Sequence, residues 1–218
     1  MIDKIEKKEA LWFGWEKVKA EPSYFVGLML LAAVTFVVPS YISGRLIVVS
    51  ESLSVIIFLA SWFLQIGVGL GLIGLALKFS QGLRPPLSEL FNYFRFFWPY
   101  FLASLLYSLV IFAGVILLVV PAFVWGIKYS LFPFFIIDKG VRPLEALHLS
   151  AEATRGVKWQ LFLFLLLLAL INLAGVLLAG VGLLLTVPVT YIAWAHVYSR
   201  LTGKPSVPIP GGSVQSSR

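Results

Sequence analysis

Long apolar stretches separated by short charged segments dominate the chain. Six of them approach the ~20 residues that a helix needs to cross the hydrocarbon core of a bilayer. They run approximately over Tyr24–Ile42, Leu53–Phe79, Phe96–Val120, Pro121–Ile137, Gln160–Leu178 and Val181–Leu201. The third and fourth meet at Pro121, and only Ala179 and Gly180 separate the fifth from the sixth, so each pair predicts a tight helical hairpin. The fourth stretch is short, which leaves five or seven crossings open beside six.

The apolar stretches belong to a threefold repeat, approximately over residues 5–79, 82–138 and 140–202. In each copy an amphipathic stretch precedes a hairpin, and each hairpin contains a proline in similar company: VVPSYISG from Val37, VVPAFVWG from Val119 and TVPVTYIA from Thr186. Every copy begins on the same side, which implies parallel repetition about an axis along the membrane normal. We predict an all-α polytopic membrane bundle, with six transmembrane helices in three hairpin repeats that form one integral membrane domain over residues 1–202.

The stretches before the hairpins predict amphipathic helices. In the second copy one helical face would hold the residues at i, i+3, i+4 and i+7, namely Leu87, Leu90, Phe91 and Phe94. In the first copy the corresponding face is Leu11, Trp15 and Val18. Such helices either lie in the headgroup plane with the aromatic side down or pack on the cytoplasmic ends of the bundle.

Composition excludes an ordinary soluble fold. The chain of 218 residues is 60% hydrophobic and only 12% charged, with a mean hydropathy of +0.95, whereas soluble domains are about 45–50% apolar and about 25% charged. Cysteine is absent, which removes disulfides, thiolate metal sites and cysteine nucleophiles. The polar tail, residues 203–218, has too little apolar surface to pack and is predicted to be a disordered cytoplasmic segment.

The basic residues set the orientation, because loops rich in lysine and arginine stay on the cytoplasmic face. Fifteen of the seventeen fall in the predicted inner segments, so both termini are expected in the cytoplasm of a multi-pass protein of the cell membrane. The formal net charge of +7 favours anionic lipid headgroups on that side. Candidate headgroup contacts are Arg84, Arg95, Arg142, Arg155, Lys158, Trp98 and Trp159.

Several polar residues fall at membrane depth, where they are costly and suggest function. A solute or proton path could be lined by Lys128, His196, Asn172, Gln65 and Tyr191. Alternatively, Lys128 extends toward the nearer headgroups and His196, four residues before Arg200, lies at the cytoplasmic interface.

Motifs for conventional chemistry are weak. Gly69 to Gly74 matches the dinucleotide pattern GxGxxG, but it lies inside an apolar run and not in a turn between a strand and a helix. We interpret it as a helix-packing face, because Gly67 and Gly71 have the small-xxx-small spacing that lets two helices approach closely. Gly175 and Ala179 have the same spacing. Glu145, His148 and Glu152 share one helical face, yet a di-iron site would need further glutamates from other helices. We expect no catalytic residues, no metal site and no cofactor.

The second half of the chain contains RPLEALHLSAEATRGVKW, then an apolar hairpin, then TVPVTYIAWAHVYSRL. Through this order it resembles a group of uncharacterised prokaryotic multi-pass membrane proteins. They are related to the membrane domain fused to some glycerophosphoryl diester phosphodiesterases. The resemblance covers roughly Gly82 to Leu201. In that family the phosphodiester chemistry belongs to a separate soluble barrel, so the resemblance implies a membrane module without catalytic residues.

Three functional hypotheses follow. The preferred one is a non-catalytic membrane module that engages lipids or membrane partners through its basic cytoplasmic face. The second is a transporter or channel for a small solute along the repeat axis, and the third is a lipid-modifying membrane enzyme. Partners are expected among membrane lipids, a second copy of the chain or another membrane protein, and not among nucleic acids.

Overall fold

The computed structural model describes residues 6–46, 50–117, 119–178 and 180–204. Within these residues the chain is built from helices, which confirms the predicted all-α class. Of the tail predicted to be disordered, Gly203 and Lys204 are described, and residues 205–218 lie outside the described part of the chain. The elements in chain order are α1 (Lys7–Ala20), α2 (Pro22–Leu46), α3 (Glu51–Ser80), the 3-10 helix η1 (Leu87–Phe96), α4 (Phe97–Leu117), α5 (Val119–Tyr129), α6 (Phe132–Lys139), α7 (Pro143–Ala153), α8 (Lys158–Leu177) and α9 (Leu183–Leu201).

Five helical segments in the described part of the chain are long and apolar enough to cross a membrane: Pro22–Arg45, Glu51–Ser80, Leu87–Leu117, Val120–Lys139 and Lys158–Leu177. The chain is therefore a multi-pass membrane protein by helix length and hydropathy. The sixth predicted crossing corresponds to α9, whose second half is more polar because it contains His196, Ser199 and Arg200. A sixth crossing and the threefold repeat stay predictions.

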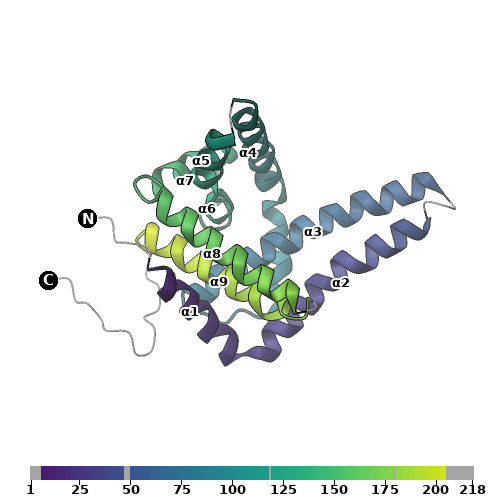
Figure 1. Ribbon diagram of the computed structural model, residues 1–218. Coiled ribbons are helices and arrows are strands. Elements are labelled where there is room, and N and C mark those ends of the chain that lie inside the picture. Colours follow the sequence, from purple (N-terminus) through teal and green to yellow (C-terminus); the bar gives the residue numbers. More distant parts are fainter. Residues whose placement is uncertain (1–5, 47–49, 118, 179, 205–218) are drawn as a thin grey trace.

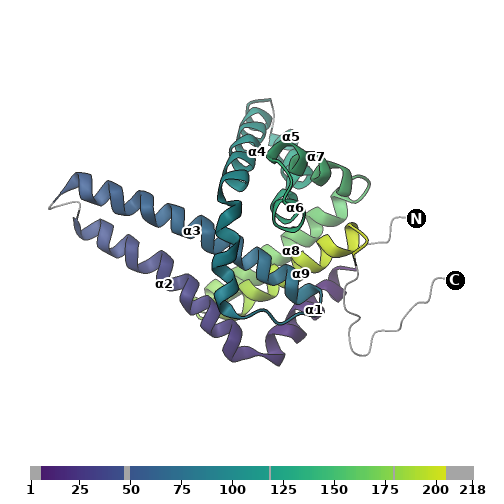
Figure 2. The same ribbon diagram turned by 180° about the vertical axis from the view of Figure 1, so that it is seen from behind.

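Two hairpins project from the body of the molecule. Figures 1 and 2 show α2 and α3 side by side as a long arm, and α4 with α5 as a second projection in another direction. The arm exposes large apolar side chains on both helices, for example Val37 (64% exposed) and Ile56 (62%). Because each Å² of apolar surface in water costs about 25 cal/mol, acyl chains are the solvent that suits this arm.

The helix α9 forms the centre of the body and is contacted by α1, α2, α3 and α8 (Figure 1). Most of its second half is buried, including Ala193, Ala195 and Tyr198. Small residues allow the close approach. A Cβ atom on Gly14 of α1 would lie 2.6 Å from the carbonyl oxygen of Val189, so these two backbones nearly touch.

The second amphipathic stretch forms a 3-10 helix and not the α-helix that the sequence predicted. A 3-10 helix has three residues per turn, so side chains at i and i+3 are aligned. Leu90 is fully buried and Leu87, Tyr93 and Phe96 are half-buried, whereas Phe91, predicted on the same face, is 52% exposed. The period of three explains this difference from the predicted apolar face.

The buried face of α1 is rotated from the predicted one and shares only Val18 with it. Its buried residues are Ala10, Phe13, Gly14 and Val18, while Trp15 is 42% exposed. The small side chains at 10 and 14 let α1 approach α9, which a tryptophan in the same place would prevent. The helix α1 lies along α9, from Glu9 beside Arg200 to Gly14 beside Val189, and the choice between the two alternatives left open for it stays a prediction.

The fourth predicted crossing is broken into α5 and α6 by a turn at Ser130 and Leu131. The turn frees backbone groups, and α7 satisfies them. The Ser150 hydroxyl donates to the carbonyl oxygen of Lys128 (3.1 Å) and accepts from the amide of Leu131 (3.1 Å), and the Thr154 hydroxyl also donates to Lys128 (3.0 Å). Buried backbone groups without partners cost several kcal/mol in lipid, so the break depends on α7.

Candidate functional site

Ionic side chains gather where the helices converge, opposite the tip of the α2/α3 arm. Four ion pairs there connect different elements: Lys78 with Glu89, Arg84 with Glu21, Arg200 with Glu9, and Lys204 with Asp138. We call these eight residues the polar base. All eight belong to the segments that the sequence assigned to the cytoplasmic side, so their convergence in space supports that assignment.

A polar cleft opens within this base. It has a volume of about 540 Å³ and lies between the end of α3, η1 and the end of α6. We call it the basal cleft. Its lining residues are Gly74, Leu77, Lys78, Gln81, Glu89, Asn92, Tyr93, Arg95, Ile137 and Asp138.

The 3-10 geometry of η1 creates the polar wall of the basal cleft. Glu89, Asn92 and Arg95 are three residues apart and therefore form one row along η1. An α-helix would rotate successive members of this row away from one another by about 60°. The local choice of helix type thus brings one acid, one amide and one guanidinium group to the same cavity.

Both carboxylates of the cleft already have cationic partners. Glu89 pairs with Lys78 of α3. Asp138, whose side chain is only 8% exposed, accepts hydrogen bonds from the Tyr198 hydroxyl at Oδ2 (2.7 Å) and from Lys204 Nζ at Oδ1 (2.5 Å). These bonds fasten α6 to the central helix α9 and fix one wall of the cleft.

Arg95 is the exception among the charged groups that line the cleft. Its guanidinium group lies over the ring of Phe96, 4.7 Å from the ring centroid, and among the described residues no carboxylate lies within ion-pair distance of it. Stacking on an aromatic ring restrains the side chain without neutralising it. The cleft therefore offers a held, uncompensated positive charge.

The glycines of α3 form the face that receives η1, as the sequence predicted for Gly67 and Gly71. A Cβ atom on Gly71 would lie 2.5 Å from Leu90 Cγ and 2.6 Å from the Leu90 carbonyl oxygen. Gly67 faces the Phe94 ring and Gly74 the Tyr93 ring, whereas Gly69 meets nothing within 4 Å. The glycine pattern is thus a packing face, and it supports the cleft by holding η1 against α3.

The second predicted glycine contact is seen in part. Gly175 packs against Gly182 at the start of α9, and a Cβ added to Gly182 would lie 2.7 Å from Gly175 Cα. This contact closes the α8/α9 hairpin. Ala179, its predicted companion, lies outside the described residues.

The five candidate path residues lie in separate surroundings. Asn172 of α8 donates to the Thr190 hydroxyl of α9 (2.8 Å) and to the Leu168 carbonyl (3.0 Å), so it links two helices. Lys128, in α5, lies over the ring of Tyr129 with Nζ 4.9 Å from the centroid. Gln65 is half-buried on α3.

The remaining two path candidates are on α9 and face different neighbours. His196 is 3% exposed and lies against the ring of Phe13, with centroids 4.5 Å apart. Its Nε2 atom is 4.0 Å from Glu9 Oε1, and neither ring nitrogen has a hydrogen-bond partner within the described residues. Tyr191 instead lines a small apolar cavity between α2, α3 and α9.

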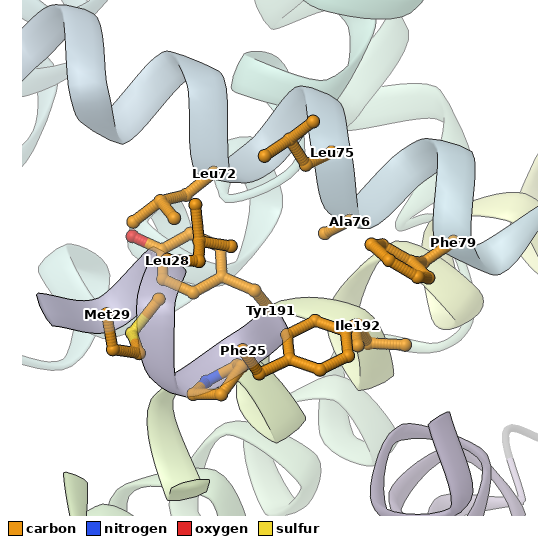
Figure 3. A pocket seen from close by; sticks show the side chains of 10 residues that line it. Phe25, Leu28, Met29, Leu72, Leu75, Ala76, Phe79, Tyr191 and Ile192 are labelled. Carbon is orange, nitrogen blue, oxygen red and sulfur yellow. The ribbon is translucent and has the colours of Figure 1, made fainter. Parts of the chain in front are cut away.

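That apolar cavity is nearly filled. Figure 3 shows Phe25, Leu28, Leu72, Phe79 and Ile192 converging on it from three helices. Its volume is about 10 Å³, roughly the space of one water molecule. A space of this size and polarity is a packing gap, and it gives no support to a solute path at this junction.

The candidate headgroup contacts are mostly accessible. Trp98 at the start of α4 is 66% exposed and Trp159 at the start of α8 is 69% exposed. Of the basic candidates, Arg84, Arg95, Arg142 and Arg155 are exposed, and Lys158 is half-buried. Each tryptophan thus stands with a basic residue near the beginning of a long apolar helix, the position that anchoring residues take at membrane interfaces.

Several residues of the site were not singled out from the sequence, namely Lys78, Gln81, Glu89, Asn92, Tyr93, Asp138, Tyr198 and Lys204. The three-residue spacing of Glu89, Asn92 and Arg95 predicts a shared face only if the segment forms a 3-10 helix. Asp138 pairs with a residue 66 positions away, and nothing local in the sequence indicates that contact.

Metal binding gains no support in the described residues, where no group of three or more potential ligand side chains gathers. His148 Nδ1 lies 3.8 Å from Glu152 Oε1 on the exposed side of α7, which is an ordinary surface pair. Comparison with protein-family models, with curated proteins and with solved structures finds no match for this chain.

Proposed function

We propose that the chain is a non-catalytic membrane module whose basic cytoplasmic face binds anionic lipid headgroups. One observation carries the proposal: the apolar α2/α3 arm extends away from the polar base, at which four ion pairs between separate segments of the chain converge. In this proposal α9 is a sixth crossing and the three hairpins derive from repeated units. The resemblance to prokaryotic membrane modules is in keeping with this function.

Electrostatics supports an anionic partner. The acids of the polar base are neutralised within the protein by lysine and arginine, so the charge that a membrane meets comes from the side chains beyond these pairs, where basic residues outnumber acidic ones. Arg142 and Arg155 are two of them, and both are exposed. Each basic residue near an anionic surface contributes about 1 kcal/mol of attraction.

The lipid preference can be measured on the full chain in nanodiscs that contain equal amounts of phosphatidylglycerol and phosphatidylcholine. We expect phosphatidylglycerol to be enriched among the lipids retained by the protein in native mass spectrometry. Replacing both Arg142 and Arg155 by glutamine should reduce that enrichment about thirtyfold, because two favourable charges of about 1 kcal/mol each are lost and about 1.4 kcal/mol corresponds to a factor of ten.

Arg45→Gln is the matched control, since this arginine lies at the far end of the α2/α3 arm. The control should keep the enrichment of the unmodified chain. Equal retention of the two lipids by the unmodified protein would contradict the proposed function.

The six-crossing arrangement has its own test, which the absence of cysteine makes simple. We expect single cysteines at Gly44, near the arm tip, and at Val181, between α8 and α9, to react with a membrane-impermeant maleimide added to intact cells. Cysteines at Leu83 and Glu145 should react only after permeabilisation. All four positions are exposed. Protection of position 181 in intact cells would contradict a sixth crossing.

A further inference from the structure

We propose that the basal cleft is a specific site for one lipid phosphate group, with Arg95 as its main ligand. This inference rests on the proposed function, but it goes further, because the cytoplasmic face could attract anionic lipids through its summed charge without any defined site. The basal cleft supplies what a defined site needs: a bounded volume, a restrained cation and neutral donors around it.

The first step is the chemistry of the lining. Arg95 presents a planar guanidinium group, which binds phosphate oxygens through two parallel N–H donors. The amides of Gln81 and Asn92 and the hydroxyl of Tyr93 line the same cavity and can each donate a further hydrogen bond. A tetrahedral anion with several acceptor oxygens matches this set of donors.

The second step is the charge balance. The cleft contains two carboxylates, and each is already matched by a lysine: Glu89 by Lys78 and Asp138 by Lys204. Arg95 leaves a surplus of one positive charge. Lys78 also keeps donors beyond the one that it gives to Glu89, so an incoming anion meets a second cation without having to displace a carboxylate.

The third step is restraint. Stacking on Phe96 limits the conformations of the Arg95 side chain, and the Gly71 contact with Leu90 fixes η1 on α3. The opposite wall is held by Asp138 through its bonds to Tyr198 and Lys204. A preorganised site loses less side-chain entropy on binding, which favours affinity for one ligand over diffuse attraction.

The fourth step assigns the phosphate to a lipid. The cleft lies beside the C-terminal end of the apolar helix α3 and close along the chain to Trp98, the exposed residue at the start of α4. In the proposed topology this level is that of the cytoplasmic headgroups. A phospholipid can place its phosphate in the cleft while its acyl chains remain among the apolar helices.

The test compares four versions of the full chain in nanodiscs that contain phosphatidylglycerol: unmodified, Arg95→Gln, Arg95→Lys and Arg45→Gln, the last at an exposed arginine that also lies over an aromatic ring but at the far end of the α2/α3 arm. Native mass spectrometry counts the phosphatidylglycerol retained after washing at roughly 1 M salt, where a Debye length of about 3 Å removes diffuse attraction. We expect one lipid per chain to be retained by the unmodified protein and by Arg45→Gln. Arg95→Gln should reduce its occupancy at least tenfold, and Arg95→Lys should reduce it severalfold, because a point charge cannot bind bidentately.

The outcomes separate this inference from the proposed function. Equal retention by Arg95→Gln and Arg45→Gln would overturn the specific site, even where phosphatidylglycerol is still enriched at low salt. A second comparison adds inorganic phosphate to the protein in phosphatidylcholine nanodiscs. Tight binding of phosphate that depends on Arg95 and displaces phosphatidylglycerol would overturn the assignment to a lipid. Arg95 is exposed, and thermal unfolding of each variant checks that the fold is kept.

Discussion

Replacing Gly71 by leucine should lower the free energy of unfolding by about 3 kcal/mol, measured by thermal unfolding in detergent. Even the first added carbon would lie 2.6 Å from the Leu90 carbonyl oxygen and 2.5 Å from Leu90 Cγ. Backbone atoms cannot rotate away as a side chain can, so the leucine has to push η1 off α3. Because η1 supplies Glu89, Asn92 and Arg95, the basal cleft would be lost together with the packing.

Gly69→Leu is the matched control, since Gly69 is two residues away on the same helix and a Cβ there meets nothing within 4 Å. The control should keep the stability of the unmodified protein or gain slightly, because glycine in a helix interior is less stable than other apolar residues by up to about 1 kcal/mol. Equal melting temperatures for the two variants would show that the close contact between α3 and η1 is not formed.

Replacing Asp138 by alanine should cost about 3 kcal/mol of stability, because a buried hydroxyl left without its hydrogen-bond partner costs about 1–3 kcal/mol and the attraction to Lys204 is lost as well. The Tyr198 side chain is fully buried, and its hydroxyl donates to Asp138. Without the carboxylate, this hydroxyl and Lys204 both lose a partner. The measurement is again thermal unfolding in detergent, with lipid retention in the same samples.

Asp138→Asn separates the two bonds. Its amide oxygen can still accept from Tyr198, while the attraction to Lys204 is lost, and that pair is partly exposed. We expect a loss of about 1 kcal/mol, in the range of exposed ion pairs. If Asp138→Ala and Asp138→Asn were equally destabilised, the hydrogen bond to Tyr198 would contribute nothing measurable and the proposed anchoring of α6 would be wrong.

The sequence was informative wherever a property is local. Apolar length predicted α2, α3, α4 and α8, with ends that differ from the structure by a few residues. The glycine spacing in α3 predicted a packing face because close approach requires the absence of a side chain, which can be read directly. What the spacing could not name was the partner, since η1 packs there by tertiary contact.

Predictions that depended on helix type or on a neighbour were weaker. Periodicity arguments assume 3.6 residues per turn, so η1, with three, exposes Phe91 where burial was predicted. In α1 the predicted face was Leu11, Trp15 and Val18, but burial followed Ala10 and Gly14, which allow α9 to come close, and only Val18 of the predicted face is buried. The basal cleft combines both difficulties, because it needs a 3-10 helix and contacts between distant segments.

The turn between α5 and α6 affects how the chain is inserted into the membrane during synthesis. Lys128 and Leu131 leave the ribosome before Ser150 and Thr154 do, and Thr154 follows Lys128 by 26 residues. Until then the nascent chain has a backbone carbonyl and an amide that acyl chains cannot satisfy. The translocon should therefore retain the segment from Val119 to Lys139 beside its aqueous channel, releasing it sideways only after α7 has emerged.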